Sequence, residues 1–402
     1  MVAQWKTDGI SALWPEINGP FLSLRGIPEH LMPVTETQEL YKDLLLGFDA
    51  ITSCEMKELY KFKLFLNRMH QRSNLPPELL LIHKAFIAWV NFEYERARTL
   101  FTQHLKAYPS DIITIFFVHM LDFCTGKTPR LTAEFSFCEP HIPHTHALYS
   151  YYLAIKSFVL CEDQCFQEAL ELGLEAVRLI PHNIYGIHAT AHALHEMGRW
   201  QEISSFLIDC KPDWIENSGM RMHVYWHMAI AHERCNEVEQ ALQAFEELYE
   251  LKDSPFAKQD LDAVGFLWRL RLKATDSKFN AIWERLALLW TGSVSGSTSY
   301  FHKIHAALAF SATNQTLLIE KQLAESDGFG IEPEAHRAGL DVLKGILLFT
   351  LKRYHESLAL LRTSRDQWPL LGGSRAQREV LDLTLEYIEL KTRPIVEERA
   401  PA

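Results

Sequence analysis

From about residue 36 onward, apolar side chains recur at intervals of three and four residues, the period of an amphipathic helix. The pattern begins in ELYKDLLLGFDAITS and continues in MKELYKFKLFLNRMHQ, which predicts a first helical hairpin with its turn near Ser53 and Cys54. Strict alternation of apolar and polar residues, the signature of a half-buried strand, is almost missing. The pattern therefore predicts an all-α protein.

The helical pattern repeats along the chain. From Glu78, a small residue at Ala85, an aromatic residue at Tyr94 that opens a second helix, Phe101 and a closing Pro109 match a tetratricopeptide repeat of roughly 34 residues. Small residues let the two helices of a repeat approach closely, and aromatic residues fill the space beside them. Further copies start at Ser150, Ile184, Met222, Tyr300 and Ala338.

Two of the intervals between these starts are about twice as long as the others, so each leaves room for one degenerate hairpin, at 112–146 and 260–292. We therefore expect a right-handed α-solenoid of about eight such hairpins that encloses a concave central cavity. Residues 37–392 should form this single superhelical domain, closed by a capping helix in SRAQREVLDLTLEYIEL. Residues 393–402 should form a loose tail.

The first 36 residues hold a high density of helix-breaking residues: Pro15, Gly19, Pro20, Gly26, Pro28 and Pro33. Proline removes a backbone donor and glycine favours irregular backbone. We expect an extended N-terminal arm with one short turn.

Composition narrows the classes of partner and compartment. The net charge is −11 and Lys and Arg are scattered, which argues against nucleic acid. Seven cysteines without a CxxC pair fit reduced thiols. A basic, apolar leader and a membrane-length apolar run are both missing, so we expect a cytoplasmic protein without a membrane partner. Nothing in the sequence specifies an oligomeric state.

Histidines concentrate in the third and fourth repeats. His188, His192 and Glu196 follow one another at intervals of four, and His223 and His227 repeat that spacing, so each set shares one helix face. The repeat register turns the first set, together with His195, toward the concave side and leans the second toward it. His305 falls at the same repeat position as His227. We expect His188, His192, His223 and His227 to form one site.

Three interpretations of this cluster are open. In the first, the histidines are structural and bond to each other and to backbone. In the second, they line a pocket for an organic anion or acyl group. In the third, His188, His192, His223 and His227 bind a divalent metal ion, and Glu196 is a third ligand beside a His-xxx-His pair or a group that supports the ligands. The HExxH motif of zinc hydrolases is not present, because alanine follows His188 and His192. Asp262 and Arg269 are candidates for an ion pair beneath the cluster.

Five segments carry a resemblance to a known family: IHATAHALHEMGRW, MHVYWHMAIAHE, DAVGFLWRLRL, IHAALAF and GGSRAQREVLDLTL. In this order and spacing the chain, from about residue 40 to 390, resembles the tetratricopeptide repeat protein 38 family. The resemblance implies an α-helical repeat fold and a cytoplasmic location, and it supplies no activity. Arg375 departs from the pattern, since relatives usually have His or Asn there. The positions that match are His188, His192, Glu196, His223, His227, Asp262, Arg269, His305, Gln377 and Arg378.

Two classes of function follow. The first is a binding protein with a histidine-lined central pocket for a small molecule or peptide, which most tetratricopeptide arrays suggest by analogy. The alternative is an enzyme that uses the His and Glu side chains as metal ligands or as general acid and base. Peptide-binding arrays carry Lys and Asn at the inward positions, whereas this chain carries His and Glu. That difference favours a small ligand.

Overall fold

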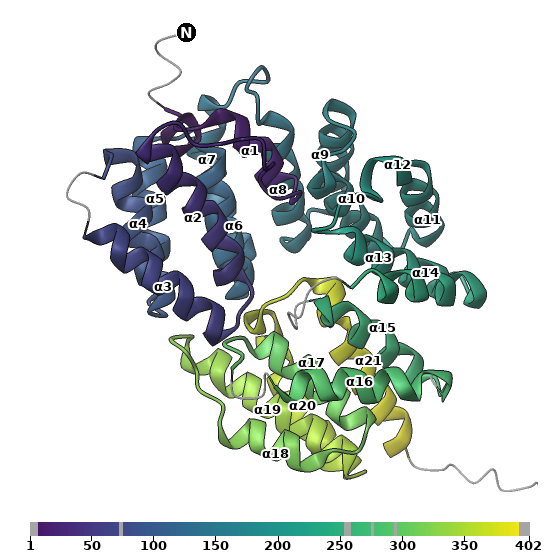
Figure 1. Ribbon diagram of the computed structural model, residues 1–402. Helices are drawn as coiled ribbons and strands as arrows, with labels where there is room; N and C mark the ends of the chain where they lie inside the picture. The colour runs from purple at the N-terminus through teal and green to yellow at the C-terminus, as the bar shows by residue number, and fades with distance from the viewer. Residues whose placement is uncertain (1–6, 72–74, 253–258, 275–276, 293–295, 394–402) are drawn as a thin grey trace, which may run out of the picture.

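The computed structural model describes residues 7–71, 75–252, 259–274, 277–292 and 296–393. Within these ranges the chain is all-helical and forms no β-strand, apart from one isolated bridge between Glu55 and Ser297. The predicted all-α class is confirmed, and the arrangement of successive helices is consistent with an α-solenoid (Figure 1). Its handedness, the number of repeats and an enclosed central cavity stay predictions. No helix in the described part of the chain is long and apolar enough to cross a membrane.

Consecutive helices pack on each other in pairs joined by short turns. The pairs are α2 (Glu36–Thr52) with α3 (Met56–His70), α4 (Pro77–Val90) with α5 (Tyr94–Ala107), α8 (Tyr149–Glu162) with α9 (Phe166–Leu179), α10 (Ile184–Glu196) with α11 (Trp200–Asp209), α13 (Arg221–Arg234) with α14 (Val238–Glu250), α17 (Tyr300–Ala312) with α18 (Thr316–Ala324), and α19 (Pro333–Thr350) with α20 (Tyr354–Ser364). The remaining helices beyond residue 36 are α6 (Ile112–Cys124), α7 (Thr132–Cys138), α12 (Lys211–Trp214), α15 (Leu261–Leu272), α16 (Asn280–Thr291) and α21 (Arg375–Thr392). Each of the two long intervals holds two helices, and their expected pairing as degenerate hairpins stays a prediction.

The hairpin turns share one backbone conformation. All seven pass through one residue with positive φ just after the first helix, a conformation that lets the last carbonyl groups of a helix find partners. These residues are Cys54, Phe92, Gln164, Gly198, Asn236, Asn314 and Lys352. The small residues of the repeat pattern are buried where the paired helices meet: Ala85, Ala169, Ala191, Ala229 and Ala307. The repeat pattern therefore works through close helix approach.

The prediction of an extended N-terminal arm is wrong for residues 9–22, whereas residues 23–35 form no helix. Gly9–Ala12 form a 3₁₀ turn, and Pro15–Leu22 form α1. Pro15 occupies the first turn, where a helix needs no backbone donor. The side chains of Ile10, Trp14 and Ile17 are buried against the first hairpins, so tertiary packing overrides the local proline signal. The predicted loose tail lies outside the described residues, except for residue 393.

The two ends of the helical array touch each other. The Thr298 amide donates to the carbonyl of Cys54 over 2.8 Å, and the Met56 amide donates to the carbonyl of Gly296 over the same distance. The rings of Phe92 and Phe329 lie 5.1 Å apart. Turns of the first hairpins therefore meet the segments before α17 and α19, and the chain closes on itself, as Figure 1 shows at the junction of the purple and light-green helices.

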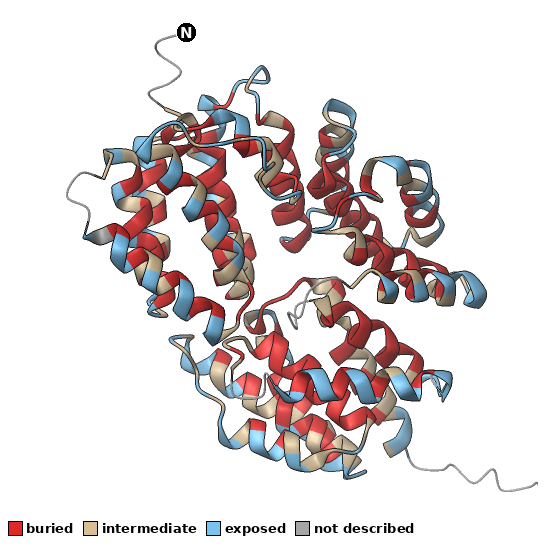
Figure 2. Cartoon of the chain, viewed as in Figure 1, coloured by how far each residue is buried: buried red, intermediate tan, exposed pale blue. Residues whose placement is uncertain are grey.

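Buried side chains form two large apolar clusters, one in each half of the chain (Figure 2). Helix α10 belongs to both. Tyr185 and Ala189 pack in the N-terminal cluster, whereas Ile187 and Leu194 pack in the C-terminal one. Helix α10 is therefore covered from both sides, and the histidines that it carries are buried.

Candidate functional site

Two helices bring the histidine cluster together. Asn183 caps α10 by accepting a hydrogen bond from the amide of Gly186, so the helix begins in a register that sends His188 and His192 to one face. Helix α13 packs against α10 and supplies His223 and His227 with the same spacing. The expected convergence of the two pairs is present in the structure.

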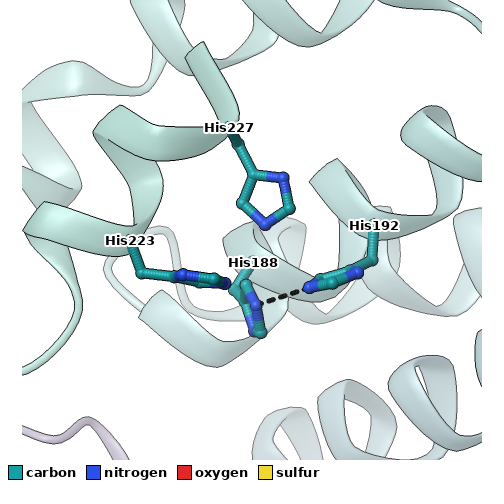
Figure 3. Close-up of side chains that lie close together, drawn as sticks. All are labelled: His188, His192, His223 and His227. Carbon is teal, nitrogen blue, oxygen red and sulfur yellow. Dashed lines mark hydrogen bonds between the residues drawn. The ribbon is translucent and has the colours of Figure 1, made fainter. Parts of the chain in front are cut away.

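The four rings point toward a common centre (Figure 3). One ring nitrogen from each of His188, His192, His223 and His227 can be chosen so that all four lie within 4.8 Å of one another. The Nε2 atoms of His188 and His192 share a hydrogen bond of 2.8 Å. Ring centroids of His192 and His227 are 4.6 Å apart, and those of His188 and His223 are 4.8 Å apart.

Burial keeps these rings neutral. The side chains of His188, His192 and His227 are almost inaccessible to water. Burial holds the pKa of each well below its usual value of 6.5, and the neighbouring histidines lower it further. A neutral imidazole carries a free lone pair on one nitrogen, which is the form that binds metal ions.

Half of the ring nitrogens in the cluster have no hydrogen-bond partner among the described residues. They are both nitrogens of His227, the Nδ1 of His188 and the Nδ1 of His192. A buried polar atom without a partner costs about 1–3 kcal/mol. The described residues therefore leave four of the eight ring nitrogens of the cluster without a hydrogen bond.

His223 differs from the others because a carboxylate orients it. Its Nδ1 donates to Oδ1 of Asp262 on α15 over 2.9 Å, which leaves Nε2 for the centre. A carboxylate behind a ligating histidine fixes the tautomer and raises the basicity of the ligand nitrogen. Asp262 therefore supports the cluster through His223. The sequence-based expectation that Asp262 pairs with Arg269 is wrong, since Arg269 bonds instead to Glu379.

The donor set fits a transition-metal ion. Four neutral imidazoles suit zinc, copper, iron or nickel, whereas magnesium and calcium prefer oxygen ligands. Metal–nitrogen bonds of about 2.0–2.1 Å place tetrahedral ligand atoms about 3.3 Å apart. The four chosen ring nitrogens lie within 4.8 Å of one another, so small shifts of the side chains would satisfy that geometry. His188, His192, His223 and His227 would hold the ion.

Other predicted site residues lie around the cluster and not in it. Glu196 pairs with Arg375 over 3.0 Å, and burial raises the pKa of its carboxyl. Arg378 bonds to Glu162 and to backbone carbonyls near Gly372 and Gly373. Gln377 completes a capping box at the start of α21 with Ser374. These residues are contributed by the end of α10 and by α21, so they border the cluster on one side.

Arg269 and His305 lie next to Trp226, and Arg269 also bonds to Glu379 of α21. The Trp226 ring stacks on His223 at 5.0 Å, and the guanidinium of Arg269 lies 5.5 Å from the centre of the same indole. His305 is fixed by a 2.8 Å hydrogen bond from Nδ1 to the carbonyl of Phe301. The sequence placed Arg269 and His305 near the histidines, but it did not single out Trp226. Trp226 stands between His223 and His227 in MHVYWHMAIAHE, and this position was the signal that could have pointed to it.

A cleft of about 640 Å³ opens beside the cluster. It lies between the end of α10, the start of α11, the 3₁₀ segment Arg365–Leu371 and α21. Residues on its wall include His195, Glu196, Trp200, Trp368, Arg375 and Glu379. His195 also touches the cluster, since its ring lies 6.2 Å from that of His227. Burial lowers the pKa of His195 to about 4, so a neutral imidazole stands between cleft and cluster.

No protein-family model matches this chain. Membership of the tetratricopeptide repeat protein 38 family therefore stays a prediction based on the resemblance of the histidine segments.

Proposed function

We propose that the protein binds one transition-metal ion through His188, His192, His223 and His227, and that a small molecule binds at this ion. The observation that carries the proposal is the convergence of four buried, neutral imidazoles, half of whose nitrogens lack partners. Purely structural histidines would be expected to satisfy those nitrogens with protein groups. A shared ion would be bound by one nitrogen of each ring.

The charge of such a centre favours an anionic ligand. Four neutral imidazoles leave the charge of a divalent ion uncompensated, and Asp262 supplies one negative charge through His223. A buried net positive charge attracts an anion that replaces lost hydration. The cleft of about 640 Å³ falls within the size range of small-molecule sites. We therefore favour a small anionic ligand over a peptide.

The position of His195 supports a catalytic role as the second candidate function. When bound, the ion would supply Lewis-acid activation of a coordinated ligand atom. His195 faces both the cleft and His227, so its neutral imidazole can accept a proton from a ligand that spans the two. Glu196, held by Arg375, lies at the same wall and would orient the ligand.

Metal analysis of protein purified without an affinity tag tests the proposal. We expect about one equivalent of a transition metal in the wild type after dialysis against Zn²⁺, and loss of that equivalent in His192→Ala and in His227→Ala with helical circular dichroism retained. His232→Ala is the matched control, because His232 is buried on α13 but bonds to Glu237 outside the cluster. Equal metal content in all four proteins, or none in the wild type, would overturn the proposal.

A further inference from the structure

Three nitrogen atoms that face one another lie next to the candidate metal centre. Nη1 of Arg269, Nε1 of Trp226 and Nε2 of His305 lie 3.6, 3.6 and 3.8 Å from the point where a side chain at Gly265 would begin. Because residue 265 is glycine, that point holds no atom of the residue itself. All three side chains are at least nine-tenths buried. They come from α13, α15 and α17, so three helices build this pocket.

Some polar atoms of the residues that form the pocket have no hydrogen-bond partner in the described part of the chain. Nε1 of Trp226 and Nε of Arg269 have no hydrogen-bond partner among the described residues. A tryptophan N–H that is buried normally finds an acceptor. Nε1 of Trp226 therefore offers one free donor to the pocket. Nη1 of Arg269 donates to the carbonyl of Gly265 over 2.8 Å and has a second N–H, on a guanidinium that stays charged in proteins.

The third wall offers an acceptor. Nδ1 of His305 lies 2.8 Å from the carbonyl of Phe301, and a carbonyl can only accept, so this nitrogen carries the proton. In the neutral ring Nε2 then carries a lone pair. The pocket therefore combines two donors with one acceptor. An oxygen that accepts two hydrogen bonds and donates one matches this set, which describes a hydroxyl group and not a carboxylate oxygen.

The pocket and the histidine cluster are directly coupled through α15. Asp262 and Gly265 are three residues apart and Arg269 follows four residues later, so all three share one helix face. Asp262 orients His223, and the Trp226 ring stacks on His223 and lies 4.8 Å from His227. Trp226 therefore contacts two rings of the cluster and also borders the pocket through its Nε1.

We infer that this pocket, formed by Trp226, Arg269, His305 and Gly265, binds a hydroxyl group of the ligand, and that the site prefers hydroxycarboxylates to plain carboxylates. The inference rests on the proposed function, because the carboxylate would bind the metal ion. A site built to hydrogen-bond a ligand hydroxyl discriminates strongly against the analogue that lacks it, since its buried polar groups are then left unpaired.

Matched pairs of acids test the inference on the Zn²⁺-loaded protein. Glycolate is compared with acetate, and 3-hydroxypropionate with propionate, so that each pair differs by one hydroxyl at two chain lengths. Binding is followed by the ¹⁵N-indole signal of Trp226, assigned with Trp226→Phe. We expect at least one hydroxy acid to bind roughly tenfold or more tightly than its partner.

Gly265→Ala is the decisive variant, because its methyl group occupies the pocket at ordinary contact distances of 3.6–3.8 Å. It should bind Zn²⁺ as the wild type does and lose the preference for the hydroxy acid. Gly292→Ala, at the end of α16 and 3.7 Å from the nearest carbonyl, is the matched control and should change neither property. Equal binding within both pairs, or a preference that survives in Gly265→Ala, would overturn the inference.

Methanol separates this inference from the proposed function. Titrated into metal-free protein, this smallest organic hydroxyl compound should give a saturating shift of the Trp226 indole signal that is lost in Gly265→Ala. That shift without Zn²⁺ binding would refute the metal centre and leave a hydroxyl pocket. Zn²⁺ binding without the shift would retain the metal centre and refute the pocket.

Discussion

His227→Leu is the substitution that most directly separates a metal centre from a structural histidine cluster. Both ring nitrogens of His227 are buried without a hydrogen-bond partner among the described residues, and leucine has a similar volume with no polar atom. If the His227 ring serves to bind an ion, burial of its two unpaired nitrogens destabilises the metal-free protein. We therefore expect His227→Leu to stabilise the metal-free protein and to abolish stabilisation by metal.

The size of the effect follows from the two unpaired nitrogens. Each costs about 1–3 kcal/mol, and an imperfect fit of the leucine side chain returns up to about 1.5 kcal/mol, so a net gain of about 1 kcal/mol is a conservative figure. Unfolding entropies of about 2.1 cal/mol/K per residue, taken over 402 residues, convert this gain into a rise in Tm of about 1 °C when the chain melts as one unit. Zn²⁺ at a hundred times its Kd adds about 2.7 kcal/mol to the wild type, or about 3 °C.

Scanning calorimetry with a chelator and then with excess Zn²⁺ measures both effects. His83→Leu is the matched control, because Nε2 of the equally buried His83 bonds to the carbonyl of Leu66 over 2.8 Å. This variant should lose about 1 kcal/mol and respond to Zn²⁺ as the wild type does. A lower Tm for His227→Leu in chelator, or a Zn²⁺ response that persists in it, would show that His227 is structural.

Two further predictions concern other parts of the fold. Burial lowers the pKa of Lys303 from 10.5 to about 8, so the unfolded chain binds more protons than the folded chain between pH 8 and 10.5. The free energy of unfolding of the wild type should therefore rise across this window relative to Lys303→Met, by up to roughly 3 kcal/mol. Urea unfolding at several pH values measures this difference, and parallel pH profiles for the two proteins would contradict it. Gly330 and Gly26 have φ of +74° and +73°, but a side chain at Gly330 would lie 2.0 Å from the carbonyl of Phe92, whereas nothing lies within 4 Å at Gly26. Gly26→Ala should therefore cost about 1 kcal/mol of backbone strain, while Gly330→Ala should cost more and increase the radius of gyration in X-ray scattering, because it separates the ends of the array; equal effects would contradict this reasoning.

The sequence predicted the histidine cluster because helix periodicity is a local property. His188 and His192 repeat the spacing of His223 and His227, and any two neighbouring helices of a repeat array pack at about 8–10 Å. Spacing alone therefore placed both pairs in reach of each other. Burial, which decides their protonation, depends on both apolar clusters around α10 and could not be obtained from spacing.

The sequence did not predict the contacts between distant segments. Asp262 and Arg269 lie about two turns apart on α15, and the packing of α15 against α13 and α21 decides that Asp262 bonds to His223 and Arg269 to Glu379. The helix Pro15–Leu22 was missed for a related reason. Its prolines argue against a helix locally, and only the packing of Trp14 and Ile17 on remote hairpins outweighs them.

Arg375 links the cleft to the question of which ligand reaches the centre. This residue is where the sequence departs from the family that it resembles, and its Nε donates to Glu196 across the cleft wall. His or Asn at this position is shorter and would carry no permanent charge, so Glu196 would face the cleft without a cationic partner. In this chain Arg375 neutralises Glu196, so the cleft wall that includes His195 carries one negative charge less than it would with a neutral His or Asn at this position. An anion that approaches the cluster past His195 is therefore repelled less, and we expect the Arg375→Asn variant to bind an anionic ligand more weakly than the wild type.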